Sequence, residues 1–71
     1  MTTEEVFAER LTKALEERQM MKKDFAKEVG YDKHSIIQWT TGKRLPRGDA
    51  LVAICTTLGV SADWLLGLDE E

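Results

Sequence analysis

A glycine in the middle of the chain, Gly30, separates two short helical patterns and limits the possible folds more than any other residue. Residues 22–29 before it and residues 33–41 after it both carry apolar side chains at helical spacing. Ala26, four residues before the glycine, is small enough to let two helices cross closely, and Ile36, six residues after it, can pack back into the angle between them. Because glycine tolerates a positive φ, the chain can reverse sharply there. The sequence therefore predicts two short helices joined by a tight turn.

Helical patterns also cover the rest of the chain, and no alternating apolar pattern is long enough to indicate a sheet. The helices are expected at residues 3–18, 22–29, 33–41, 49–58 and 62–66. Residues that suit helix starts precede three of them, namely Thr2 with Glu5 in capping-box spacing, Asp32 and Ser61. In the fourth helix the buried face is expected to hold Leu51, Ile54, Cys55 and Leu58. The predicted fold class is all-α, a single domain over residues 1–71 with an ordered core at about 3–67 and a frayed acidic end at 69–71.

The charged residues are distributed unevenly. The whole chain carries a net charge of −3, which by itself argues against a polyanionic partner. Residues 22–47, however, hold seven lysines and arginines against three acidic residues, a net charge of +4, whereas residues 1–21 carry −2 and residues 48–71 carry −5. Binding to a polyanion depends on the local patch rather than on the total. The basic segment is therefore either a solvated face or a surface for nucleic acid, and motifs have to decide between them.

Several short motifs follow one another in a consistent order. They are the pattern around Gly30, the sequence Trp-Thr-Thr-Gly-Lys-Arg-Leu-Pro at 39–46, Leu51 with Ile54 and Cys55, and the segments 58–61 and 63–67. Their order and spacing together resemble the lambda repressor and Cro-like family, also called Xre-like, over nearly the whole chain. The resemblance implies a five-helix DNA-binding domain in which the second and third helices form a helix-turn-helix.

In that family the third helix lies in the major groove and reads base edges. The resemblance implies base contacts by the outward-facing residues Lys33, His34, Ser35, Ile37 and Gln38. Gln38 suits adenine, Lys33 suits guanine, and Ile37 suits a thymine methyl group. Phosphate contacts are implied for Lys22, Thr41, Lys43 and Arg44, with Arg47 as a further candidate. The expected function is sequence-specific binding of double-stranded DNA by a transcriptional regulator, a repressor of phage, prophage or bacterial origin.

Two residues favour a different function. Met21 stands where relatives usually have the Ser or Thr that caps the second helix, so phosphate binding there is expected to be weaker. Ile37 follows Ile36, and two adjacent aliphatic side chains on a short helix cannot both face the core. Ile37 therefore contacts a thymine methyl, contacts a protein, or is partly buried. The alternative is therefore a protein-interaction module, antitoxin-like or anti-regulator-like, that keeps the fold and does not bind DNA by itself.

The sequence contains no set of residues that is typical of a catalytic site. His34 and Cys55 are the only His and Cys and lie on different expected helices, and the chain has no phosphate-cradling glycine loop. No enzyme activity, metal, cofactor or small-molecule ligand is expected, and His34 is either a DNA contact or an ordinary surface residue. Cys55 is expected to be an inert core thiol. Trp39 and Trp64 fall on apolar faces and are expected in the core rather than as stacking platforms for single strands.

Members of the resembled family often dimerise through the last helix. The resemblance therefore implies a homodimer on a two-fold symmetric operator, with contacts by Trp64, Leu65, Leu66 and Leu68. No apolar stretch approaches the roughly 18 residues of a membrane span, and the acidic start of the chain is unlike a secretory signal. A cytoplasmic, nucleoid-associated protein is expected. Residues 69–71 also fit the start of a linker, as in the DNA-binding part of a longer repressor.

Overall fold

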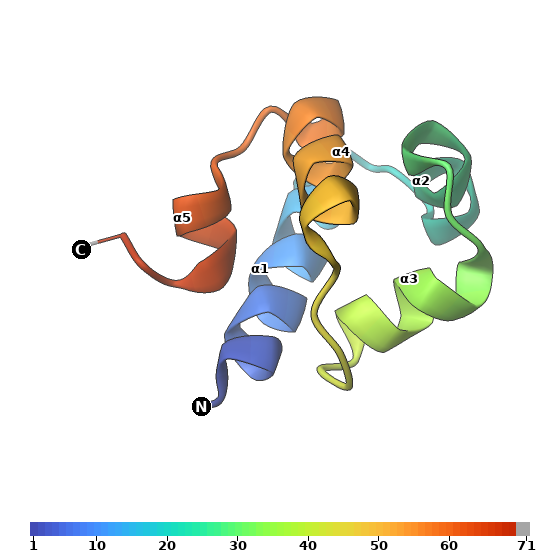
Figure 1. Ribbon diagram of the computed structural model, residues 1–71. Coiled ribbons are helices and arrows are strands. Elements are labelled where there is room, and N and C mark those ends of the chain that lie inside the picture. The colour runs from blue at the N-terminus through green and yellow to red at the C-terminus, as the bar shows by residue number, and fades with distance from the viewer. Residues whose placement is uncertain (70–71) are drawn as a thin grey trace.

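The computed structural model describes residues 1–69, which form five α-helices joined by short connections (Figure 1). The helices are α1 (Thr3–Glu17), α2 (Lys22–Val29), α3 (Lys33–Thr40), α4 (Gly48–Leu58) and α5 (Ala62–Leu66). α2 and α3 lie at one end of the molecule and α5 at the other, with α1 and α4 between them (Figure 1). The predicted all-helical class and its five elements are confirmed. Of the acidic end expected to fray at 69–71, Asp69 instead pairs with Arg10, and Glu70 and Glu71 lie outside the described residues.

Local side-chain caps begin three of the helices, as the sequence predicts. The hydroxyl of Thr2 accepts a hydrogen bond from the Glu5 amide at 3.1 Å, and the Glu5 carboxylate accepts one from the Thr2 amide at 2.9 Å. The first turns of α3 and α5 each have one such bond, in which the side chain of Asp32 or Ser61 accepts from the amide three residues later. Met21 provides no side-chain cap for α2. The first amides of α2, which have no acceptor within the helix, therefore receive no hydrogen bond from the side chain of the preceding residue.

The connection between α1 and α2 was expected from the sequence, but its backbone conformation was not. It depends on Gln19, which adopts φ +52 although it is not a glycine. The amide of Gln19 donates to the Glu16 carbonyl and that of Met20 to the Leu15 carbonyl, both at 3.0 Å, so the two bonds close the end of α1. Met20 then packs partly buried against the core. Side-chain packing and these hydrogen bonds offset the cost of a left-handed conformation at a residue with a Cβ.

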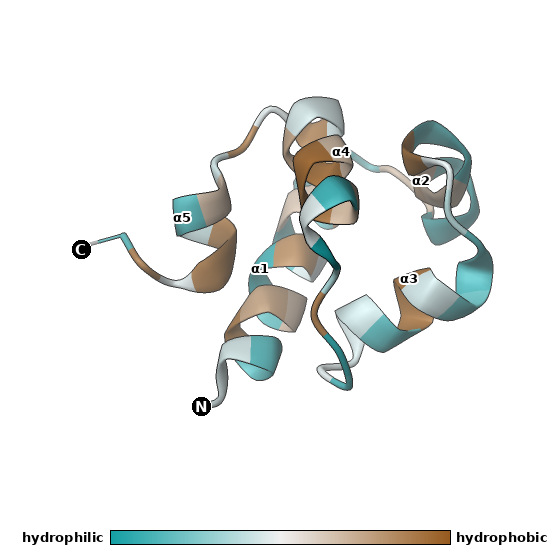
Figure 2. Ribbon diagram, viewed as in Figure 1, coloured by the Kyte–Doolittle hydropathy of each residue, from teal (hydrophilic) through white to brown (hydrophobic). Residues whose placement is uncertain are grey.

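The hydrophobic core draws on every helix. Its largest fully buried side chains are Phe7 and Leu11 from α1, Phe25 from α2, Ile36 from α3, Ile54 from α4 and Leu65 from α5. α1 packs against α3 and α5, and α2 packs against α3 and α4. α2 is largely hydrophilic, with its apolar part on the side of α4 (Figure 2). The core therefore holds α2 and α3 to the body by one face each and leaves their other faces in solvent.

The structure corrects the expected burial of three residues. On α4 the buried face consists of Ala50, Ile54 and Leu58, while Leu51 and Cys55 are only partly buried. Partial burial raises the pKa of the Cys55 thiol, because the charged thiolate loses solvation. Trp64 is likewise half-buried rather than in the core, whereas Trp39 is buried as predicted. No helix within residues 1–69 is long and apolar enough to cross a membrane.

Candidate nucleic-acid interface

The orientation of α3 is fixed by two buried side chains on one of its faces. Ile36 is fully buried, and Trp39, one turn further on, packs edge-to-face against Tyr31 with 5.4 Å between ring centroids. The start of the helix is fixed by Asp32, whose carboxylate accepts a hydrogen bond from the Ser35 amide at 2.9 Å. α3 is thus anchored at its start and along its inner face, and its outer face is presented in a defined direction.

The five residues expected to contact bases all lie on α3, and none of them is buried. Lys33, His34 and Ile37 are exposed, and Ile37 has 40% of its surface accessible. Ser35 and Gln38 are half-buried. Of the two adjacent isoleucines, Ile36 therefore faces the core and Ile37 faces solvent, as the sequence requires. Polar, cationic and aliphatic groups suited to base edges share the outer side of this helix.

The loop after α3 is tied back to the end of that helix. The amides of Lys43 and Arg44 both donate to the Gln38 carbonyl, at 3.0 and 3.4 Å, and the Thr41 hydroxyl donates to the Ile37 carbonyl at 2.7 Å. The side chains of Thr41, Lys43 and Arg44 are exposed. These three expected phosphate contacts therefore project from backbone that is fixed to α3. Arg47 is also exposed, at the N-cap of α4.

The starts of α2 and α3 meet at one groove. Lys22 from α2 and Lys33 from α3 both line it, although the sequence gives them separate roles. Lys23 also lines the groove and was not among the expected contacts. The sequence alone could not identify Lys23 as a groove residue, because the crossing of α2 and α3 decides which lysines face the groove.

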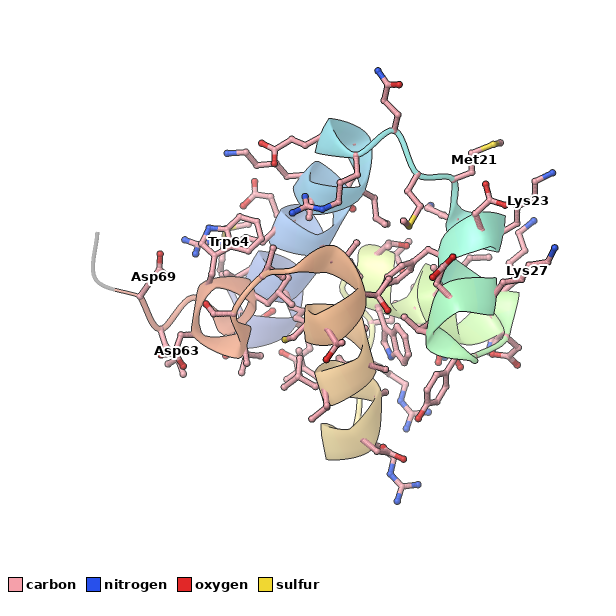
Figure 3. All side chains as sticks on the ribbon, turned by 90° about the horizontal axis from the view of Figure 1, so that it is seen from above. Met21, Lys23, Lys27, Asp63, Trp64 and Asp69 are labelled. Atoms are coloured by element: carbon pink, nitrogen blue, oxygen red, sulfur yellow. The ribbon has the colours of Figure 1, made fainter. Side chains whose placement is uncertain are left out.

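The lysines and arginines of α2, α3 and the loop after α3 form no ion pair with a carboxylate within residues 1–69. The two ion pairs of the described chain join Arg10 to Asp69 at 2.8 Å and Arg18 to Glu17 at 3.9 Å, and neither involves α2, α3 or the loop after α3. Lys23 and Lys27 project from the α2 end of the molecule, whereas Asp63 and Asp69 lie at the opposite end (Figure 3). These two lysines of α2 therefore lie at the opposite end of the molecule from Asp63 and Asp69, and their charge is available to a polyanion.

The residues expected in a dimer contact have different surroundings. Leu65 is fully buried in the core, so it cannot contact a second subunit without leaving that core. Leu68 has 66% of its surface accessible, and Trp64 and Leu66 are half-buried. The described structure thus leaves three of these four residues accessible to a partner.

Side-chain contacts of Arg10 hold α5 against α1, and the sequence did not predict them. Its guanidinium donates to the Trp64 carbonyl at 2.7 Å, pairs with the Asp69 carboxylate and lies 5.4 Å from the centre of the Trp64 ring. These partners are 54 and 59 residues away along the chain. A contact over such a separation has no local pattern that could have predicted it.

Lowering the pH should weaken the start of α3. Hydrogen bonding by Ser35, through its side chain and its amide, lowers the pKa of the Asp32 carboxyl, with a smaller contribution from the charge of His34. A lowered folded-state pKa means that the ionised form stabilises the fold at neutral pH, and that this contribution is lost as the pH falls through the folded-state value. Thermal unfolding of wild type and Asp32→Asn, from pH 7 down to pH 3, measures the stabilisation that the ionised carboxylate provides. Asparagine caps as well and does not titrate, so the stability advantage of wild type should shrink on acidification. Parallel pH curves for the two proteins would contradict this assignment.

Within residues 1–69 no group of three or more His, Cys, Asp or Glu side chains is placed to hold a metal ion. A family model described as a helix-turn-helix domain matches residues 8–71, a range that includes α2, α3 and the loop after them. No curated protein and no solved structure matches the chain.

Proposed function

Because this chain belongs to the helix-turn-helix domain family, we propose that it regulates transcription by sequence-specific binding of double-stranded DNA. The single observation that carries the proposal is the placement of α3. One face of this helix is held by Ile36 and Trp39, and the other presents unburied polar and cationic side chains. The loop cations beside it have no carboxylate partners among residues 1–69. A helix presented in this way fits the major groove. The activity is binding alone, so the proposal requires no cofactor and no catalytic step.

Each residue of the outer face has a chemical role in this proposal. Gln38 bonds an adenine edge, Lys33 donates to guanine, and Ile37 packs on a thymine methyl group. His34 and Ser35 contact bases or phosphates close to the start of the helix. Phosphate oxygens are held by Lys22, Thr41, Lys43, Arg44 and Arg47, all of which are exposed. A protein with this activity acts in the compartment that holds the DNA, which is the cytoplasm of a bacterial cell.

The proposed regulator is a homodimeric repressor. Leu68 is the most exposed of the expected dimer residues, and Leu66 and Trp64 lie beside it along the chain. A contact there would join two copies at the end of the molecule opposite to α2 and α3. Two recognition helices related by a two-fold axis read half-sites about 34 Å apart on one side of the duplex. Such a dimer represses by occupying the promoter.

A second candidate function is binding to another protein in place of DNA. It is favoured by two exposed apolar side chains near α3, Met21 with 60% and Ile37 with 40% of their surfaces accessible. Selection of bound duplexes from a random pool, repeated at two salt concentrations, separates the candidates. A regulator yields one enriched motif at both concentrations, and a protein-interaction module enriches none.

Substitution of one base-reading and one phosphate-binding residue tests the roles individually. Gln38→Ala should relax discrimination at one base pair by about 1–3 kcal/mol, because one bidentate base contact is lost. Lys43→Ala should weaken binding to all sequences by a similar factor, because phosphates carry no sequence information. Affinities for the selected operator and its single-base variants measure both effects. Lys13→Ala, an exposed lysine of α1, is the control for loss of charge. A uniform loss of affinity in Gln38→Ala would contradict its role as a base reader.

A further inference from the structure

The groove at the starts of α2 and α3 has a floor that DNA binding does not explain. Its volume is about 520 Å³, and its apolar lining is provided by Leu15, Met20 and Met21. Leu15 is buried and Met20 half-buried, but Met21 is mostly exposed. A phosphate backbone offers hydrogen-bond acceptors and negative charge, and neither needs an apolar floor. A concave site of this volume, with an apolar floor and a few charged side chains, is instead typical of a site for a ligand that carries apolar groups.

The rim of the same groove is basic. Lys22, Lys23 and Lys33 line it, whereas Glu16 of α1 is its one acidic residue. None of the three lysines takes part in either ion pair of residues 1–69. A ligand that fits both parts must therefore combine apolar groups for the floor with negative charges for the rim.

We propose that this groove docks an acidic, leucine-containing peptide segment of a partner protein. Charge complementarity selects the acidic groups, and the methionines accommodate leucine side chains because their thioethers and unbranched chains adapt to irregular shapes. The groove is open and is built from flexible side chains at three helix ends, which suits a peptide segment. Lys22 and Lys33 belong both to this groove and to the proposed DNA surface, so the peptide and DNA exclude each other. This exclusion rests on the proposed function, whereas the docking itself does not.

The docking is tested without DNA by fluorescence anisotropy with a labelled peptide of alternating leucine and glutamate. Two matched peptides, one of serine and glutamate and one of leucine and serine, separate the charged from the apolar contribution. Only the leucine–glutamate peptide should bind well, at least about tenfold more tightly than either control. Equal binding of the serine–glutamate peptide would show a general attraction of acidic chains and would overturn the proposal.

Two lysines of α2 provide a matched pair of variants. Lys23 lines the groove, and Lys27, one turn further along the same helix, does not. Figure 3 shows both side chains projecting from α2 on the side of Met21. Lys23→Glu should weaken peptide binding about tenfold or more, because it places a like charge on the rim, and Lys27→Glu should change it less than about threefold. Met21→Ser should also weaken binding, whereas Val52→Ser, at an exposed apolar residue of α4 outside the groove, should not. Equal effects of Lys23→Glu and Lys27→Glu would overturn the assignment of the groove.

Competition is measured by adding the leucine–glutamate peptide to the protein bound to its selected operator. Saturating peptide should release the DNA, and release should be reduced in Lys23→Glu. If the peptide binds and the DNA stays bound, the shared role of Lys22 and Lys33 is wrong. A protein that binds no DNA at all contradicts the proposed function, and the peptide titrations still decide whether the groove docks a partner.

Discussion

Ile36→Ala is expected to lower the free energy of unfolding by about 2–5 kcal/mol. Ile36 is fully buried in the core, so truncation leaves a cavity. A domain of this size has a total stability of roughly 4–10 kcal/mol. The melting temperature should therefore fall by about 10–40 °C, as measured by circular dichroism.

Ile37→Ala is the matched control, because it makes the same change at the next residue. Its side chain is partly in solvent, so the loss of stability should be less than about 1 kcal/mol. Its effect should appear instead in DNA selectivity, at a position where the operator has thymine. Equal destabilisation by the two substitutions would mean that α3 does not present the face described above.

DNA affinity is expected to fall about 10⁴-fold when the salt concentration rises from 50 to 200 mM. Each phosphate neutralised by a lysine or arginine contributes about −0.9 to the slope of log K against log salt. The proposed interface has four such residues in each subunit, namely Lys22, Lys43, Arg44 and Arg47. In a dimer the eight residues of the two subunits together give a slope of log K against log salt of about −7. Titrations of the selected operator at several salt concentrations measure it.

Substitution of a single cation should change this slope by a defined amount. Lys43→Ala removes one phosphate contact from each subunit, so the slope of the dimer should become less steep by about 2. Lys13→Ala, on α1, should leave it unchanged. A slope near zero in the wild-type protein would contradict a DNA interface built on these residues, and an unchanged slope in Lys43→Ala would remove that residue from it.

The positions of the helices could be predicted from the sequence to within one residue at each end. α2 and α5 have the expected bounds, α1 and α3 end one residue early, and α4 begins at Gly48 instead of Asp49. These signals are local, since a cap such as Asp32 acts within one turn and Gly30 ends its helix by its own φ of +80. The exposure of Ile37 and the burial of Ile36 also follow from spacing along one helix.

Features that depend on where two helices cross could not be predicted. The sequence suggested Cys55 for the buried face of α4, but the packing of that helix gives the place to Ala50. Leu65 and Leu68 have the same residue type, and only the docking of α5 on α1 buries the first and exposes the second. Arg10 binds partners far away in the chain, and Gln19 forms a turn that would ordinarily favour glycine.

The candidate site also combines features that the sequence sets with features that only the tertiary structure sets. The residue types of α3, and the local excess of positive charge around it, are properties of the sequence, because both are set over a few turns of chain. The groove that joins Lys22, Lys23 and Lys33 over an apolar floor is a property of the tertiary structure. Its parts come from α1, the turn after it, α2 and α3, and only core packing fixes the relative positions of these elements.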